Sequence, residues 1–403
     1  MEPQQNSKMS KVAEIFDNLT NLQKSLVTAI LAIVLFSLFA GVTYSYFSTG
    51  KVSLSNLAVI GGNLPKPADN AGEDPNQPKT EVCPLNGSKH TKAASEAWTT
   101  RRPLAVMIEN HQEARPQSGL SSADIIYEAV AEGGITRFMA VFYCNSLPDI
   151  QVGPIRSART YYLDWLGEYN ALYAHVGGAN SSGPADALGQ IIKYGILDLN
   201  QFSIGYPTFW RDYQRLGHPV ATEHTMYSTT QKLWKIGETR GWTSVDTETK
   251  KDWKTGFVTW KFKDDASAGP ASKIDVAFWG NQPNYDVSWK YDPSCNCYKR
   301  FNGGSEHLDL DTNKQLETKN IVIQFEAEQN ANDGYENNVH LLYGTTGTGR
   351  ALIFQDGKTV EGKWTKTSRL LRSKYTDANG SEVKFNQGLI WIQTVPVGSK
   401  ISY

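Results

Sequence analysis

The feature that most constrains this chain is an unbroken apolar segment near its start. The 23 residues from Ser25 to Phe47 carry no charge. A helix of that length rises about 34 Å, which is enough to cross the roughly 30 Å hydrocarbon core of a bilayer. We therefore predict one transmembrane helix at 25–47, preceded by a short N-terminal segment at 1–24.

The charges around this segment predict its orientation. Lys8, Lys11 and Lys24 precede it, whereas the next eighteen residues contain only Lys51. By the positive-inside rule, the N-terminus is cytoplasmic and everything after the helix is extracytoplasmic. No Ala-x-Ala-like cleavage site follows, and aromatic residues end the segment, so we favour an uncleaved single-pass anchor in the plasma membrane over the alternative, a cleaved signal peptide.

The overall charge argues against one class of partner. Lys plus Arg number 40 and Asp plus Glu number 41, so no net field draws the protein to nucleic acid, and no nucleic-acid partner is expected.

The cysteines leave their pairing open. Cys83, Cys144, Cys295 and Cys297 lie in the region predicted to be exported, where disulfides persist. Cys83 with Cys144 and Cys295 with Cys297 is one of three possible pairings, and the C-x-C pair is equally compatible with reduced thiols. Too few ligands lie near His307 for a zinc site, so no metal and no cofactor are predicted.

Beyond the apolar segment, composition divides the chain into three parts. Residues 48–96 are rich in Gly, Pro, Asn and Asp, which indicates a flexible extracytoplasmic linker. Residues 97–245 alternate strand-like runs with helical candidates, which favours an α/β or α+β domain. Residues 246–403 hold β-branched and aromatic runs between turns, which predicts a mostly β domain. In the first domain we expect strands at 104–108, 125–130, 138–143 and 172–176, and helices at 155–169 and 182–194.

Polar residues gather at two predicted strand ends. The strand at 104–108 runs directly into Glu109, Asn110 and His111, and α/β domains place ligands at strand ends. A predicted Gly-Gly hairpin follows, with Glu132 and Arg137 flanking its turn. Glu132 and Arg137 would equally fit a simple ion pair across the hairpin.

The sharpest local signal follows Gly153-Pro154. Arg156, Ser157 and Arg159 fall in the first turn of the predicted helix at 155–169, where cations oppose the helix dipole. A bound anion would compensate them, gripped by guanidinium groups and free N–H groups. A carboxylate of the protein would do so equally well, supplied by Glu109, Glu128 or Glu132. The ligand-binding candidates are Arg156, Ser157, Arg159, Arg137 and Asn110.

Acid–base candidates are few. His175 stands near a strand end before a Gly-Gly turn, and His218 and His224 lie in a polar loop. A lone histidine is more often structural than catalytic. No G-x-S-x-G, P-loop or H-E-x-x-H motif occurs. The catalytic candidates are Glu109, His111, Glu132 and His175. Six tryptophans of the second domain fit a β core or a glycan-stacking surface.

Long strings in both domains carry a family resemblance. RPLAVMIENHQEARPQSGLSSADIIYEAVAEGGITRFMAVF, VGPIRSARTYYLDW and YAHVGGA, then ALIFQDGK, EGKWTK, FNQG and GLIWIQTVP, resemble the YerB-like lipoprotein family. The resemblance covers about three quarters of the chain. It implies a two-domain, membrane-attached extracytoplasmic protein of a bacterium, with an α/β first domain, a β-rich second domain and no established activity. This chain lacks a cysteine after its apolar segment, so we expect attachment by the helix rather than by lipid.

Three functions remain after these observations. The first is an anchored cell-envelope binding or scaffold protein, with a phosphate or carboxylate site in its first domain and an anionic envelope ligand, cell-wall glycan or envelope protein as partner. The second is an envelope hydrolase or transferase acting on phosphate-bearing lipid-linked or cell-wall glycan. The third is a regulator of another envelope enzyme. An enzyme requires that Glu109, His111, Arg156, Arg159 and His175 converge in one cleft.

Overall fold

The computed structural model describes residues 19–20, 23–24, 76–267, 269–270, 273–335 and 339–403. The chain divides into two units at Pro67, and all described residues from 76 onward belong to the second. The predicted transmembrane helix at 25–47 lies outside the described residues. Across the described part of the chain, no helix has the length and apolar character needed to cross a membrane.

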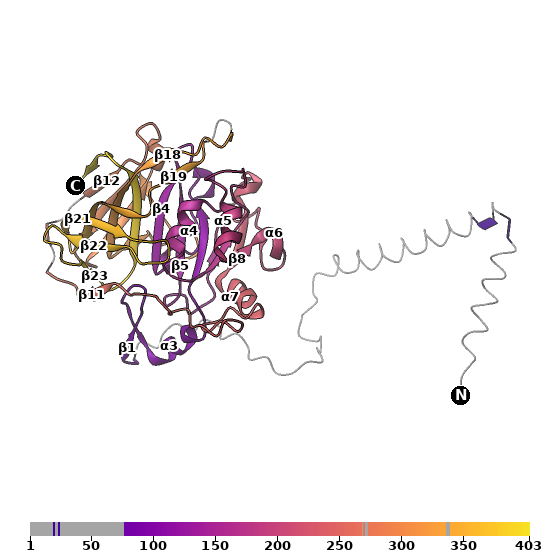
Figure 1. Cartoon of the computed structure of the whole chain (residues 1–403), viewed down its shortest axis with the longest axis horizontal. Helices are drawn as coiled ribbons and strands as arrows, with labels where there is room; N and C mark the ends of the chain where they lie inside the picture. Colours follow the sequence, from indigo (N-terminus) through magenta and orange to yellow (C-terminus); the bar gives the residue numbers. More distant parts are fainter. Residues whose placement is uncertain (1–18, 21–22, 25–75, 268, 271–272, 336–338) are drawn as a thin grey trace. The chain divides into compact units, whose positions relative to one another are not determined.

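A ten-stranded mixed sheet forms the centre of the second unit (Figure 1). Its strand order is β22-β21-β20-β17-β24-β4-β5-β3-β7-β8. The strands are β3 (Leu104–Glu109), β4 (Ile125–Glu132), β5 (Ile135–Phe142), β7 (Leu172–His175), β8 (Leu197–Asn200), β17 (Asn320–Glu326), β20 (Gly347–Gln355), β21 (Lys358–Lys366), β22 (Lys374–Asp377) and β24 (Ile390–Pro396).

This sheet passes through both predicted domains. Strands β3 to β8 come from the first and β17 to β24 from the second. The two sets meet where β24 pairs in parallel with β4, placing Ile390 opposite Ile125. The central strands are mostly apolar and buried along nearly their whole length because both faces of the sheet are covered, and every residue of β3 is buried. Such continuous apolar runs explain why the strands expected at 104–108, 125–130, 138–143 and 172–176 are all present.

A six-stranded sheet packs on the first. It comprises β12 (Lys273–Val276), β13 (Val287–Asp292), β14 (Cys297–Asn302), β15 (Ser305–Glu306), β16 (Glu317–Thr318) and β25 (Ile401–Ser402). Trp289 on β13 meets Trp391 on β24 edge to face, with ring centroids 5.2 Å apart. Both are fully buried, and Trp253, Trp260 and Trp364 are also buried. The core interpretation is therefore confirmed for five of the six tryptophans, whereas Trp279 is half-buried and packs against the core.

Short strands and helices complete the unit. The remaining strands are β1 (Lys79–Val82), β2 (Lys89–Thr91), β6 (Gln151–Val152), β9 (Trp210–Arg211), β10 (Met226–Thr229), β11 (Lys261–Lys263), β18 (Glu328–Asn330), β19 (Leu341–Tyr343) and β23 (Lys384–Asn386). The α-helices are α3 (Lys92–Thr99), α4 (Thr160–Leu166), α5 (Ala187–Tyr194), α6 (Gln201–Ile204) and α7 (Thr230–Thr239). The 3-10 turns are η2 (Gln112–Ala114), η3 (Leu120–Ser122), η4 (Thr222–His224) and η5 (Pro283–Tyr285).

Both helix expectations need correction at their starts. The helix expected at 182–194 begins only at Ala187 as α5, and the helix expected at 155–169 begins only at Thr160 as α4. The reason is clear for α4. The preceding backbone is extended because its N–H groups bond to neighbouring segments: Arg156 N donates to Met107 O at 3.0 Å and Ala158 N to Gly177 O at 2.9 Å. These donors are therefore not helix-end groups available to an anion, and the helix-dipole argument for an anion does not apply.

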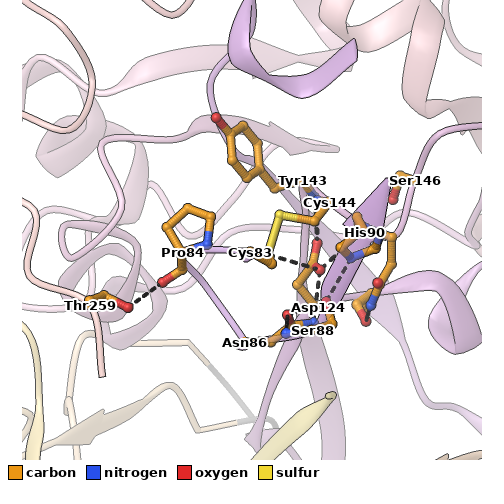
Figure 2. The surroundings of a disulfide bond; sticks show 12 residues. Cys83, Pro84, Asn86, Ser88, His90, Asp124, Tyr143, Cys144, Ser146 and Thr259 are labelled. Carbon is orange, nitrogen blue, oxygen red and sulfur yellow. Dashed lines mark hydrogen bonds between the residues drawn. A yellow bond between two sulfur atoms is a disulfide. The ribbon is translucent and has the colours of Figure 1, made fainter. Parts of the chain in front are cut away.

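The structure also corrects the end of the predicted linker at 48–96. Residues 79–99 form β1, β2 and α3, and Cys83 is bonded to Cys144 after β5. Figure 2 shows the carboxylate of Asp124 beside this disulfide, where it accepts hydrogen bonds from Asn86 Nδ2 at 2.9 Å and from Cys144 N at 3.0 Å. The segment was assigned to the linker because it is polar, but the disulfide and the buried carboxylate attach it to the sheet.

Candidate functional site

A cavity opens at the carboxyl ends of three strands. β3 pairs in parallel with β7, and β7 with β8, so their carboxyl ends meet at one edge of the sheet. The cavity has a volume of about 510 Å³. Its polar lining comes from Arg156, Ser157, Asn180, Arg211 and Glu223. Ligands bind at this edge of parallel strands in α/β folds, so the position agrees with the site predicted at the end of strand 104–108.

Two arginines give the cavity its cationic groups. Arg156 keeps 27% of its side chain exposed, and its Nε lies 3.1 Å from Glu109 Oε1. Burial lowers the pKa of Arg156, although Glu109 opposes that shift. Arg211 is exposed and donates to Thr225 Oγ1 at 3.3 Å. With Glu223 as the acidic group of the lining, the lining carries one positive charge in excess.

The loop after β7 shapes one wall of this cavity. Gly177 has a φ of +58°, and a Cβ there would lie 2.9 Å from the ring of Phe202. Gly177 N donates to Asn200 Oδ1 at 3.1 Å, which ties the end of β7 to the end of β8. Only glycine adopts this conformation readily and lets the ring approach so closely.

Beside the cavity, Glu109 joins Arg156 to a histidine. His224 is 6% exposed, and its Nδ1 lies 2.8 Å from Glu109 Oε2. Burial would lower the pKa of His224, but the hydrogen bond and charge of Glu109 raise it. The ring of His111 stacks on that of His224, with centroids 4.6 Å apart. Burial and the neighbouring His224 lower the pKa of His111.

Three predicted site residues form a separate buried ion cluster. Glu132 accepts a hydrogen bond from Nε of Arg159 through one carboxylate oxygen. Its other oxygen accepts one from Nη2 of Arg137 at 3.0 Å. Burial would raise the pKa of Glu132, but these two guanidinium groups hold it at about 2. Arg137 also donates to Ser157 O at 2.9 Å. The alternative of an internal carboxylate therefore holds for both arginines of the predicted first turn, since Arg159 pairs with Glu132 and Arg156 with Glu109. The simple ion pair between Glu132 and Arg137 is also present.

Two further candidates are held within the fold. His175 is fully buried, with Nδ1 2.7 Å from Gly177 O and Nε2 2.6 Å from Asp198 Oδ1. Asn110 is also fully buried, and its Nδ2 donates to Thr136 Oγ1 at 2.7 Å. The polar atoms of both side chains are hydrogen-bonded to protein groups, so both residues are structural in this arrangement.

The predicted residues thus separate into two groups. Glu109, His111, Arg156 and Ser157 lie at or beside the cavity, whereas Asn110, Glu132, Arg137, Arg159 and His175 are engaged inside the protein. Sequence reasoning did not select His224 and Arg211 for the site. His224 lies 115 residues from Glu109, and only its place in a polar loop marked it as a candidate.

Comparisons with known proteins match both halves of the chain. Residues 90–243 match the "Protein of unknown function (DUF3048) N-terminal domain" and residues 274–392 the corresponding C-terminal domain. The chain is similar to the protein described as "Putative lipoprotein YerB" of Bacillus subtilis (strain 168), with 30% identity over 330 residues, covering 80% of this chain and 88% of the relative.

A solved structure matches the same region. The crystal structure of YerB protein from Bacillus subtilis superposes with a TM-score of 0.66 at 28% identity, covering 80% of this chain and all of that one. The resemblance seen in the sequence is therefore confirmed, as is a two-domain, sheet-rich fold with few helices.

Proposed function

Because this chain belongs to the DUF3048 family of YerB-like proteins, we propose that it is an extracytoplasmic envelope protein that binds an anionic ligand in the cavity at the ends of β3, β7 and β8. The relative's name as a lipoprotein supports a membrane-associated position outside the cytoplasm. The disulfides Cys83–Cys144 and Cys295–Cys297 fit an oxidising compartment. Attachment through the segment at 25–47 is part of the proposal.

The pair of arginines in the cavity is the observation that carries the ligand class. Arg156 and Arg211 line a space bounded by Ile155, Val176, Leu188, Phe202 and Met226. Guanidinium groups grip phosphate and carboxylate with two parallel hydrogen bonds. The apolar lining and the exposed ring of Phe202, 76% accessible, provide contacts for a hydrocarbon portion. A phosphate or carboxylate joined to an apolar group therefore fits best, as in lipid-linked envelope precursors.

The test is a thermal-shift titration of the full chain in detergent with inorganic phosphate, farnesyl phosphate and farnesol. Farnesyl phosphate should raise the melting temperature most, because it satisfies both the arginines and the apolar lining. Arg156→Gln and Arg211→Gln should each weaken the shift, and the double variant should abolish it. Arg350→Gln is the control, since Arg350 is half-exposed on β20 and does not line this cavity.

A shift that persists in the double variant would place the ligand elsewhere and remove the proposal. A shift with farnesol equal to that with farnesyl phosphate would show that the arginines do not recognise the phosphate.

A hydrolase or transferase is the second candidate, and the Glu109–His224 hydrogen bond favours it. A carboxylate on Nδ1 orients an imidazole so that Nε2 accepts a proton, as acid–base catalysis requires. Of the other predicted acid–base groups, Glu132 and His175 are committed to internal partners, whereas His111 stacks on His224. Phosphate release from farnesyl diphosphate, compared between the unaltered chain and His224→Asn, tests this candidate. Equal rates with and without His224 would exclude it.

A further inference from the structure

Three metal-binding side chains meet beside the cavity. One ligand atom each from His111, Glu113 and His224 lies within 4.8 Å of the other two. Two other groups of this kind occur among the described residues, but each contains the sulfurs of a disulfide, which are not thiolate ligands. We propose that the His111–Glu113–His224 cluster is a binding site for a divalent transition-metal ion such as zinc. This inference goes beyond the proposed function and does not depend on it.

The orientation of His224 is the first support. Glu109 Oε2 lies 2.8 Å from Nδ1, and an ionised carboxylate only accepts hydrogen bonds, so Nδ1 carries the proton. The lone pair of the neutral ring is then on Nε2, facing away from Glu109. A carboxylate behind the ring is the usual outer-sphere partner of a metal-bound histidine, because it fixes the tautomer and makes the ligand nitrogen more basic.

The distance to Glu113 is the second support. Nε2 of His224 lies 3.6 Å from Glu113 Oε2. Both atoms are acceptors when the ring is neutral, so neither satisfies the other, and a cation bound between them would be a ligand shared by both. Ligand atoms of a tetrahedral zinc ion, bonded at about 2.0–2.1 Å, lie about 3.4 Å apart. The observed separation is close to that value, and a protonated His224 is the competing explanation for the same contact.

His111 must turn to complete the site. The planes of the two imidazole rings differ by only 5°, whereas an ion bound to both must lie in the plane of each. His111 is only half-buried, and its Nδ1 accepts a single long hydrogen bond, from Glu113 N at 3.3 Å. Rotation therefore sacrifices little. The side chain of Glu113 is 52% exposed, so the site faces solvent and has room for a fourth ligand such as water.

Metal binding to the full chain in detergent, purified with chelator and then dialysed free of it, tests the proposal. Titration calorimetry with Zn²⁺ should give one ion per chain, and Co²⁺ should produce the visible absorption of a low-symmetry site. His111→Ala and Glu113→Gln should each weaken Zn²⁺ binding by about 100-fold. Loss of an outer-sphere partner alone weakens metal binding by up to about that factor, and these two residues are direct ligands. Both positions are accessible, and circular dichroism checks that the variants are folded.

His218→Ala is the matched control, because His218 is an exposed histidine six residues from His224 with Nδ1 3.2 Å from Pro219 O. Zn²⁺ affinity that is unchanged in His111→Ala and Glu113→Gln, or reduced as much by His218→Ala, would overturn the proposal. So would the absence of Zn²⁺ binding, which would leave a protonated His224 as the cation. The farnesyl phosphate titration is then repeated with chelator present. A thermal shift that persists without metal shows that the anion site binds its ligand even if the metal proposal fails.

Discussion

Replacing Glu128 with glutamine should strongly destabilise the junction between the two halves of the chain. Glu128 on β4 is fully buried and contacts Arg300 on β14, also fully buried, at 2.8 Å. Its other oxygen accepts from Trp391 Nε1 and Gln393 Nε2, both at 3.0 Å. Thr136 Oγ1 donates to the first oxygen at 2.9 Å. One carboxylate thus satisfies four donors and balances a buried guanidinium group.

Glutamine keeps the shape of the side chain but removes this compensation. A buried charge left without its partner costs about 3–5 kcal/mol. Each carboxylate oxygen of Glu128 accepts from two donors. The NH₂ group of glutamine would face one of these pairs with a donor of its own, which costs about 1 kcal/mol or more. The ring of Trp391, 4.4 Å from the Arg300 guanidinium, offsets part of the loss. We expect Glu128→Gln to lower the free energy of unfolding by about 4 kcal/mol.

Urea denaturation of the full chain in detergent measures this loss, with the fluorescence of the buried tryptophans as the signal. Glu128→Gln combined with Arg300→Met removes both charges, so the double variant should be more stable than the sum of the two single losses implies. Glu361→Gln is the control, since its pair with Arg350 spans 3.7 Å on the surface and contributes at most about 1 kcal/mol. A loss below about 1 kcal/mol for Glu128→Gln, or strict additivity, would refute the reasoning.

Two further predictions concern the disulfides and a buried acid. The Cys83–Cys144 bond spans 61 residues and Cys295–Cys297 only two, so loop entropy predicts losses of about 4 and about 1 kcal/mol when each pair becomes alanine; equal losses by calorimetry would contradict this account. Burial raises the pKa of Glu326 to about 8, above its unfolded value, so the folded state holds the proton more tightly. The contribution of Glu326 to stability should therefore be complete below its ordinary pKa of 4.5 and fall by at most about 1.4 kcal/mol per pH unit between that value and about 8. Glu326→Gln should flatten the melting temperature over that range, and an unchanged slope would show that another group titrates.

The strands of the first domain are predictable from sequence because their signal is local. A strand buried on both faces, such as β3, reads as a continuous apolar run. The pairing of β24 with β4 has no such signal, since it joins residues more than 260 positions apart. The continuity of the large sheet through both domains could not be predicted for the same reason. The attachment of residues 79–99 through Cys83 was one of three possible cysteine pairings, and the sequence does not choose among them.

The sequence points to the edge of the sheet where the cavity lies, but not to the partners of the side chains there. Glu109 marks the end of a buried strand, and the cavity opens at the same edge of the sheet. Arg156 and Arg159 are three residues apart, yet one pairs with Glu109 beside the cavity and the other with Glu132 inside the protein. Such a choice depends on which carboxylate lies nearest after folding. His224 reaches the site through η4, and no spacing in the sequence links it to Glu109.

The parallel contact between β24 and β4 has a consequence for how the chain matures. During synthesis from the N-terminus, β4 is made long before β24. One edge of β4 therefore has no partner strand until the chain has reached residue 390 and beyond. Unpaired strand edges are what chaperones and aggregating partners recognise. We therefore expect the N-terminal half to keep this edge unpaired until β24 has been made. A chain cut short before β24 would stay open between β4 and β17 and become a substrate for proteolytic quality control.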